Sequence, residues 1–280
     1  MITQIRNRLH RFNISICHLP FAQQGVLGTA VCYLLLAGCI TSEYNVGTHR
    51  HDTMLYSTAK EAAMGANIAR KIADEFKLSK SPYDIERINT IGRKVAAVCD
   101  RKEINYYFYV IEEDDKGKKD EKNAFSVPGG YVYIFKALMD DLTDEELAYV
   151  LAHEVSHVVS RHGIKRLQAA MGYNLLMVAA VGARADPEFV NGLSFALAQL
   201  IAGYSREDEF NADELAAKYL KMVGYDPRIG IDVLEKLYKE NKKEIRPLSY
   251  FRTHPYTAER IRHIKETLHL PIDVNDFINS

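Results

Sequence analysis

The sequence predicts an α+β fold that is mainly helical and carries one small β-sheet beside a central helix. Apolar residues recur at helical spacing through most of the chain after residue 56. Two stretches, residues 105–111 and 123–135, are instead rich in aromatic and β-branched residues, which is typical of strands. Between them and the later helices, Thr143-Asp-Glu-Glu146 forms a capping box ahead of an apolar stripe that predicts the central helix.

The first 38 residues differ in composition from the rest of the chain. They carry three arginines and no acidic residue, followed by an apolar run from Gly25 to Ala37. This order is typical of a signal peptide, and the run is too short for a comfortable membrane span. Leu36-Ala37-Gly38-Cys39 resembles the lipobox of bacterial lipoproteins, which implies cleavage before Cys39 and lipid on its sulfur. An ordinary signal peptide or an uncleaved anchor is the alternative.

Length and charge limit the organisation and the partners. The 280 residues allow one large domain or two small ones, and a net charge of −1 without a basic stripe argues against nucleic acid. We expect a signal peptide at residues 1–38, a lipidated polar tether at 39–55 and one domain at 56–280. Ile40 in place of an aspartate favours the periplasmic side of the outer membrane over the inner membrane, by the pattern of Gram-negative lipoproteins. After cleavage Cys99 would be alone beside the lipidated Cys39, which excludes a disulfide and a cysteine metal cluster.

The first part of the predicted domain contains two helices and then the strands. We expect helices at 57–79 and 82–101, a strand at 105–111 and a charged loop before the hairpin at 123–135. Gly129-Gly130 permits the hairpin turn. An exposed edge strand in this hairpin can bind an extended peptide through its main chain, although a purely structural hairpin is the alternative. The candidate substrate-binding residues are Asn123, Ala124, Phe125, Ser126 and Val127.

The central helix carries two histidines four residues apart. His153 and His157 in the pattern H-E-x-x-H lie on one helix face, where both imidazoles can bind one Zn²⁺. Glu154 is rotated away from that face and is placed to take a proton from a water at the metal. Chance occurrence of this pattern is the alternative, and Gly163 is the expected end of the helix.

The later helices supply the remaining candidates. Residues 164–203 predict two packed helices, and further helices follow at 205–222, at 228–241 and after residue 256. Glu209 and Asp213 are four apart on one face, so Glu209 can complete a His₂Glu zinc site while Asp213 accepts from the outer N–H of a ligand histidine. Without a metal, acids in a first helical turn are usually solvated and favoured by the helix dipole.

Four segments together resemble the HtpX/BepA-like zinc metallopeptidases, relatives of the CAAX prenyl protease. They are Asn123-Ala-Phe-Ser-Val-Pro-Gly-Gly-Tyr, His153-Glu-x-x-His157, Ser205-Arg-x-x-Glu209-x-x-Ala212-Asp213, and Thr253-His254-Pro255 followed by Glu259-Arg260. The resemblance implies a zincin-type metallopeptidase domain with one zinc on His153, His157 and Glu209. It makes Glu154 the general base, with Asp213 behind the ligands and the segment after Asn123 as substrate edge. His254 is implied as an oxyanion stabiliser or an autoinhibitory fourth ligand, with a helix-capping histidine as the alternative.

These features predict a zinc-dependent endopeptidase that acts on misfolded proteins of the bacterial envelope. The chain lacks the tetratricopeptide tail of the BepA type, so it resembles the short single-domain periplasmic lipoproteins of the family. Unfolded or misfolded envelope proteins are the implied substrates, and the lipid at Cys39 is the implied membrane contact. Two alternatives stay open, namely a zinc-stabilised, chaperone-like assembly factor for outer-membrane proteins with little proteolysis, and a zinc hydrolase that cleaves small esters.

Overall fold

The computed structural model describes residues 41–113, 121–170, 203–241 and 249–272. The chain divides after Ser42 into two units, and the second, residues 43–280, contains the elements discussed below apart from the first two residues of β1. The predicted signal peptide, the lipidation site Cys39 and most of the two helices predicted at 164–203 lie outside the described residues. Among the helices that the model describes, none combines the length and the apolar character needed to cross a membrane.

A four-stranded sheet forms the layer on which the helices pack. Its strand order is β3-β4-β6-β5, in which β4 and β6 run parallel and the other two pairs are antiparallel. The predicted strand and hairpin correspond to β4, β5 and β6, and the hairpin turn uses Gly129 and Gly130 at φ of +81° and +92°. β5 has one neighbour in the sheet and is therefore an edge strand. The strands are β3 (Lys77–Leu78), β4 (Tyr107–Glu113), β5 (Ala124–Val127) and β6 (Tyr131–Phe135).

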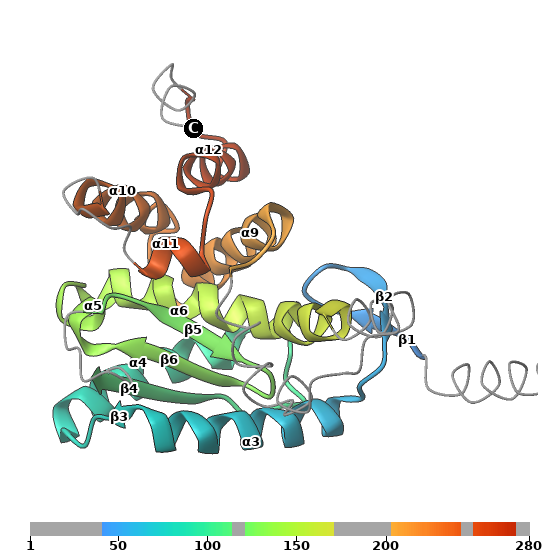
Figure 1. Cartoon of the computed structure of the whole chain (residues 1–280). Helices are drawn as coiled ribbons and strands as arrows, with labels where there is room; N and C mark the ends of the chain where they lie inside the picture. The colour runs from blue at the N-terminus through green and yellow to red at the C-terminus, as the bar shows by residue number, and fades with distance from the viewer. Residues whose placement is uncertain (1–40, 114–120, 171–202, 242–248, 273–280) are drawn as a thin grey trace, which may run out of the picture. The chain divides into compact units, whose positions relative to one another are not determined.

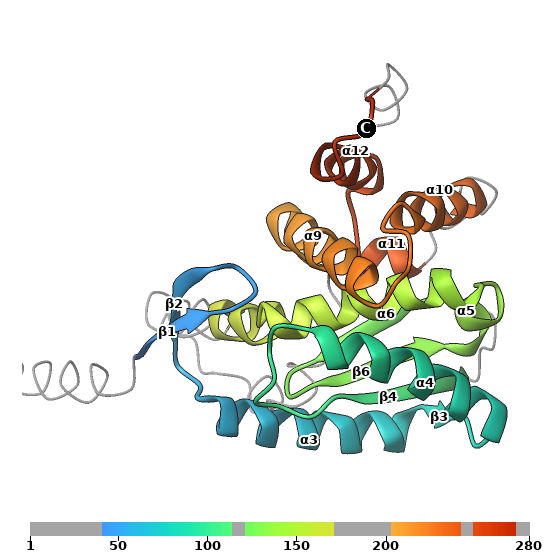
Figure 2. The same cartoon turned by 180° about the vertical axis from the view of Figure 1, so that it is seen from behind.

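Helices cover both faces of this sheet (Figure 1). On one face α3 (Thr58–Glu75) packs Ile68 and Ile72 against Phe125 and Tyr133. On the other face α4 (Pro82–Val98) and α6 (Asp144–Val159) enclose the main core. In the view from behind, α4 lies in front of the sheet (Figure 2). Beyond α6 lie the C-terminal helices, and α5 (Lys136–Asp140) joins β6 to α6. The C-terminal helices are α9 (Arg206–Met222), α10 (Ile229–Asn241), α11 (Ser249–Thr253) and α12 (Thr257–Thr267).

α6 is the most buried helix of the fold. Its predicted capping box is present, because the Thr143 side chain accepts from the Glu146 N–H and the Glu146 side chain accepts from the Thr143 N–H. Every residue from Leu147 to Val159 is buried. The helix ends at Ser160 and Arg161, whose φ is +57°, and helical structure resumes over residues 162–170. Gly163, the expected end, lies inside that second segment.

Residues 43–54 do not form the predicted polar tether. They belong to a β-hairpin made of β1 (Thr41–Asn45) and β2 (Arg50–Met54). Asn45 and Met54 are buried, and the Asn45 amide donates to the Ser160 carbonyl over 2.8 Å. The sequence pattern missed this hairpin because only these few positions are buried in an otherwise polar segment, which leaves no clear alternation of apolar residues.

Candidate metal centre

Three elements bring the candidate ligands together. His153 and His157 lie one turn apart on α6, Glu209 lies in the first turn of α9, and His254 follows α11. Their side chains are 0–1% exposed. Glu209 is 52 residues or more from the two histidines in the sequence, and the packing of α9 on α6 brings the three side chains into contact. One ligand atom from each of the four residues lies within 4.8 Å of the others.

The distances between the ligand atoms are those of a coordination shell. His153 Nε2 is 3.1 Å from His157 Nε2 and 3.4 Å from Glu209 Oε2. Glu209 Oε1 is 3.5 Å from His157 Nε2 and 3.2 Å from His254 Nδ1, which is itself 3.3 Å from His153 Nε2. Two ligands bonded to zinc at 2.0–2.1 Å with a tetrahedral angle are about 3.3 Å apart. The four side chains therefore fit one zinc ion.

The charges around the cluster also match a divalent cation. Three buried carboxylates, Glu154, Glu209 and Asp213, lie at the cluster, and the one buried guanidinium beside them, Arg260, pairs with Glu209 and Asp213. Buried charges are stable only when they are paired or coordinate a metal. With neutral imidazoles the set has an excess of two negative charges, and with a protonated His254 an excess of one, so a divalent cation would offset the negative charge in either case. The donor set and the charge thus agree on the kind of ion.

Asp213 and Arg260 support His153 and Glu209 from behind. Asp213 Oδ1 is 2.8 Å from His153 Nδ1 and accepts a hydrogen bond from Tyr149, also over 2.8 Å. Arg260 donates to both oxygens of Asp213 over 2.8 Å, and its Nη1 is 2.9 Å from Glu209 Oε2. Burial alone would raise the pKa of Asp213, but the Arg260 charge and hydrogen bonds lower it to about 2. The ionised Asp213 accepts the Nδ1 proton of His153, so the lone pair on Nε2 points into the cluster.

His157 is held by two rings on its other side. The Tyr204 ring stacks on it with centroids 3.8 Å apart and planes 14° apart. His157 Nδ1 is 2.9 Å from Nδ1 of His162, which is buried. Burial, together with the neighbouring His153, lowers the pKa of His157 well below its usual value. His157 is therefore neutral, as a metal ligand must be.

His254 faces the cluster with one nitrogen and the sheet edge with the other. Its Nε2 is 3.3 Å from the Ala124 carbonyl oxygen and 3.1 Å from Glu154 Oε1, while Nδ1 faces Glu209. Burial alone would lower the pKa of His254, but the Glu209 and Glu154 carboxylates raise it to about 10. The helix-capping alternative does not hold, because the N-cap of α12 is Tyr256 and it makes no side-chain capping bond.

Glu154 is buried beside the cluster without a hydrogen bond. Both of its carboxylate oxygens lack a hydrogen-bond partner among the described residues, although the ion-pair distance to His254 is short. Leaving a buried carboxylate oxygen unpaired is costly, so such a group in a folded protein calls for a ligand or water. Glu154 is thus free to accept a proton from a molecule that enters the site.

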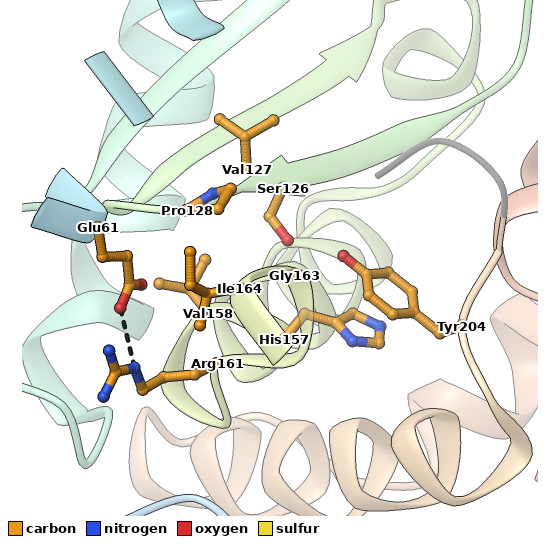
Figure 3. Close-up of a pocket in the computed structure, with 10 residues that line it drawn as sticks. All are labelled: Glu61, Ser126, Val127, Pro128, His157, Val158, Arg161, Gly163, Ile164 and Tyr204. Carbon is orange, nitrogen blue, oxygen red and sulfur yellow. Dashed lines mark hydrogen bonds and ion pairs between the residues drawn. The ribbon is translucent and has the colours of Figure 1, made fainter. Parts of the chain in front are cut away.

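The edge strand β5 runs beside the cluster, and its last residues line a pocket. The pocket measures about 190 Å³, counting the part open to solvent, and it is drawn in Figure 3. His157 and Tyr204 line one side, and Ser126 and Val127 of β5 line the opposite side. The Ser126 and Tyr204 hydroxyls point toward each other, and the far end is closed by the ion pair of Glu61 and Arg161 at 2.9 Å. The pocket therefore lies between β5 and the ligand His157.

Four residues at this site were not given a role by the sequence analysis: Tyr149, His162, Tyr204 and Arg260. Arg260 stands in the quoted Glu259-Arg260 pair, so its position was visible but its contacts were not. His162 follows His157 by five residues, which does not match the i+4 spacing of a helix face. It reaches His157 only because the chain turns at Arg161, and no local sequence signal marks that turn. Tyr204 and Tyr149 meet the cluster through long-range packing.

Comparison with known proteins identifies the family. The family model "Peptidase family M48" matches residues 82–268, which include all the candidate ligands. The chain belongs to peptidase family M48. The predicted metallopeptidase identity and the α+β fold are thereby confirmed, and the helices and small sheets described above agree with that fold.

Several M48 relatives are similar over most of this chain. The beta-barrel assembly-enhancing protease of Yersinia pestis is 30% identical over 227 residues, which cover 78% of this chain and 45% of that protein. The metalloprotease LoiP of Escherichia coli is 30% identical over 193 residues, 65% of this chain and 70% of that protein. A crystal structure of S. mikatae Ste24p aligns with a TM-score of 0.44 and 22% identity over 74% of this chain and 55% of that one. The chain thus spans less than half the length of the first relative.

Proposed function

We propose that this M48 chain is a zinc-dependent endopeptidase that cleaves proteins of the bacterial envelope. The observation that carries the proposal is the grouping of His153, His157 and Glu209 at tetrahedral spacing beside the buried carboxylate of Glu154, which makes no hydrogen bond among the described residues. The names of the relatives, a beta-barrel assembly-enhancing protease and a metalloprotease, support protein substrates.

The residues divide the work of peptide hydrolysis among them. His153, His157 and Glu209 would hold the zinc, which would supply a Lewis acid for the scissile carbonyl and lower the pKa of water. Glu154 accepts the proton that the attacking water loses and delivers it to the leaving amine. Asp213 keeps His153 in the tautomer whose Nε2 faces the metal, and Arg260 holds both Asp213 and Glu209 in place.

The substrate lies along β5 as an additional strand. Among the described residues β5 pairs with β6 alone, and the Ala124 carbonyl is 3.3 Å from His254 Nε2 beside the cluster. Main-chain hydrogen bonds to residues 123–127 hold an extended peptide regardless of its sequence. Such recognition requires a substrate segment free of its own secondary structure, which favours unfolded or misfolded proteins.

His254 closes the fourth position of the metal in the conformation described here. Its Nδ1 is within 3.3 Å of ligand atoms on His153 and Glu209, as expected of a fourth ligand. A catalytic zinc keeps one position for water or substrate. As a fourth ligand His254 would inhibit the enzyme, and a substrate would have to displace it to reach the metal.

The envelope location rests on the N-terminal sequence. Residues 1–38 have the organisation of a signal peptide, and lipid at Cys39 anchors the protein on the periplasmic side of the outer membrane. Substrates are then envelope proteins that are unfolded or stalled during assembly.

The substitution Glu154→Gln tests the proposed chemistry. It removes the proton acceptor and leaves the three metal ligands, so we expect zinc content to stay at one per chain while cleavage of an unfolded protein such as casein falls about 10²–10⁴-fold. Zinc is measured by elemental analysis and cleavage by gel electrophoresis. Undiminished cleavage would refute the role of Glu154.

The same variant separates the protease from an assembly factor that binds without cutting. If a strain that lacks the wild-type protein regains its envelope integrity with Glu154→Gln, binding rather than hydrolysis is the main activity. We expect no such rescue.

A further inference from the structure

A chain of three side chains connects the metal ligand His157 to the first turn of α9. His157 Nδ1 is 2.9 Å from His162 Nδ1, and His162 Nε2 is 3.3 Å from Asp208 Oδ1. His157 and His162 are both buried, whereas the Asp208 side chain is 32% exposed. Each nitrogen of the buried His162 ring thus has a single identified partner, and neither ring can turn without losing one contact.

The turn at the end of α6 creates this arrangement. Arg161 has a φ of +57°, which interrupts the helix after Ser160 and starts the next helical segment at His162. A continuous helix would direct the fifth residue after His157 away from it. Arg161 is fixed in this conformation by its ion pair with the buried Glu61 and by donation to the Tyr56 carbonyl over 2.7 Å. The position of His162 is therefore determined by a buried network.

Asp208 is fixed as firmly at the other end. It occupies the third position of the α9 capping box, where its carboxylate accepts from the Ser205 hydroxyl over 2.8 Å. The next residue along the chain is the ligand Glu209. The first turn of α9 thus carries Glu209, the third metal ligand. It also carries Asp208, which contacts His162 behind the second metal ligand, His157.

The positions of the ring protons follow from the chemistry of the ends. Asp208 Oδ1 lies at an ion-pair distance of 3.3 Å from Nε2 of His162, and its negative charge favours a proton on that nitrogen. A neutral His162 then has its lone pair on Nδ1, and His157 must donate its Nδ1 proton to it. This leaves the lone pair of His157 on Nε2, the atom that faces His153 and Glu209.

We propose that His162, oriented by Asp208, is a positioning residue that holds His157 in the tautomer that binds the metal. The inference rests on the metal site of the proposed function and extends it to two residues outside the cluster. Asp213 does the same for His153 through a direct contact of 2.8 Å. Both ligand histidines are thus oriented by carboxylates of α9, one turn and a half apart, and Glu209 lies between them in the sequence.

Two substitutions of His162 separate positioning from packing. His162→Asn places an amide oxygen near the position of Nδ1 and can still accept from His157, whereas His162→Leu cannot. Partners behind ligand histidines typically contribute 10–100-fold to metal affinity. We expect the leucine variant to bind zinc about 10–100-fold more weakly than the wild type, and the asparagine variant to retain most of the affinity. Affinity is measured by competition with a chromophoric chelator, and the melting temperature of the chelator-treated protein reports folding.

His263→Leu is the matched control, because His263 is not one of the cluster residues. Its Nε2 pairs instead with Glu214 at a distance of 2.7 Å. It should leave zinc affinity unchanged. The proposal is overturned if His162→Leu binds zinc as the wild type does, or if the asparagine variant is as weak as the leucine variant in a folded protein.

A measurement on the wild-type protein keeps the inference testable if His162→Leu does not fold. Long-range ¹H–¹⁵N correlation spectra of the zinc-loaded full chain report which ring nitrogen carries the proton. We expect the proton on Nδ1 in His157 and on Nε2 in His162. A proton on Nδ1 of His162 would contradict the proposal. A wild-type protein that binds no zinc would instead refute the metal site itself, and this outcome is distinguishable from the others.

Discussion

At the scale of single residues, the site is a set of buried charges that depend on one another. Arg260 contacts Asp213 and Glu209 together, and all three side chains are fully buried. Removing one member of such a set leaves a buried charge without a partner, which typically costs 3–5 kcal/mol. His254 contacts Glu209 of this set and lies at the fourth corner of the ligand cluster. It is the residue that the proposed function requires to leave its position.

Replacing His254 with alanine tests that requirement. The substitution opens the fourth position, so we expect cleavage of an unfolded protein to rise severalfold, and zinc to bind about tenfold more weakly because one ligand is lost. Initial rates at saturating zinc measure the first effect, with His263→Ala as the control. If His254 instead stabilises the transition state, its loss would lower the rate about 10²–10³-fold, and the autoinhibitory role would be wrong.

At the scale of elements, the central helix is anchored at its first turn. Glu146 accepts from the Thr143 N–H and lies 2.9 Å from the Lys236 ammonium on α10. Burial alone would raise the pKa of Glu146, but the Thr143 N–H and the Lys236 charge lower it. The contact therefore joins the start of the metal-binding helix to a helix of the C-terminal group.

The lowered pKa gives this contact a definite pH dependence. A carboxylate with a folded pKa below the unfolded value of about 4.3 stabilises the fold above that pH, and the contribution is lost as the pH falls through the folded value. Glu146→Gln keeps a side-chain acceptor for Thr143 and removes the charge. We expect it to cost about 1 kcal/mol or less at pH 7 and progressively less as the pH falls through the folded pKa of Glu146, as measured by urea unfolding.

Glu145→Gln, a change at an exposed acid in the same helical turn, serves as the control and should leave the acid slope as it is in the wild type. A constant difference between Glu146→Gln and the wild type from pH 7 to pH 2 would contradict the assignment.

The elements differ in how far the sequence alone could predict them. Periodicity and capping signals predicted α3, α4, α6, α9 and the β5–β6 hairpin, since these depend on neighbours in the chain. The β1–β2 hairpin was missed because its burial comes from distant contacts, such as that of Asn45 with Ser160. The two-residue strand β3 was missed because it is defined only by its pairing with β4. The ligand spacing of His153 and His157 is local, whereas Arg260 and His162 join the site only through packing and the turn at Arg161.

At the scale of the whole molecule, the fold brings a sheet edge and two helices to one point. α6 packs between the sheet and α9, so that its histidine face meets Glu209 while Glu154 lies toward β5 and His254. The same arrangement places the edge strand β5, whose four residues are buried, beside the metal ligands. Family and donor set therefore agree with the proposed function, hydrolysis of a polypeptide at a zinc ion, for which β5 is the proposed substrate edge.

The most direct test of this account is the zinc content of the purified protein, measured together with digestion of casein. We predict one zinc per folded chain, a zinc content close to zero in Glu209→Ala, and digestion that stops with a chelator and returns with added zinc. A folded wild-type protein that binds no zinc, or that digests casein equally well with the chelator present, would contradict the account.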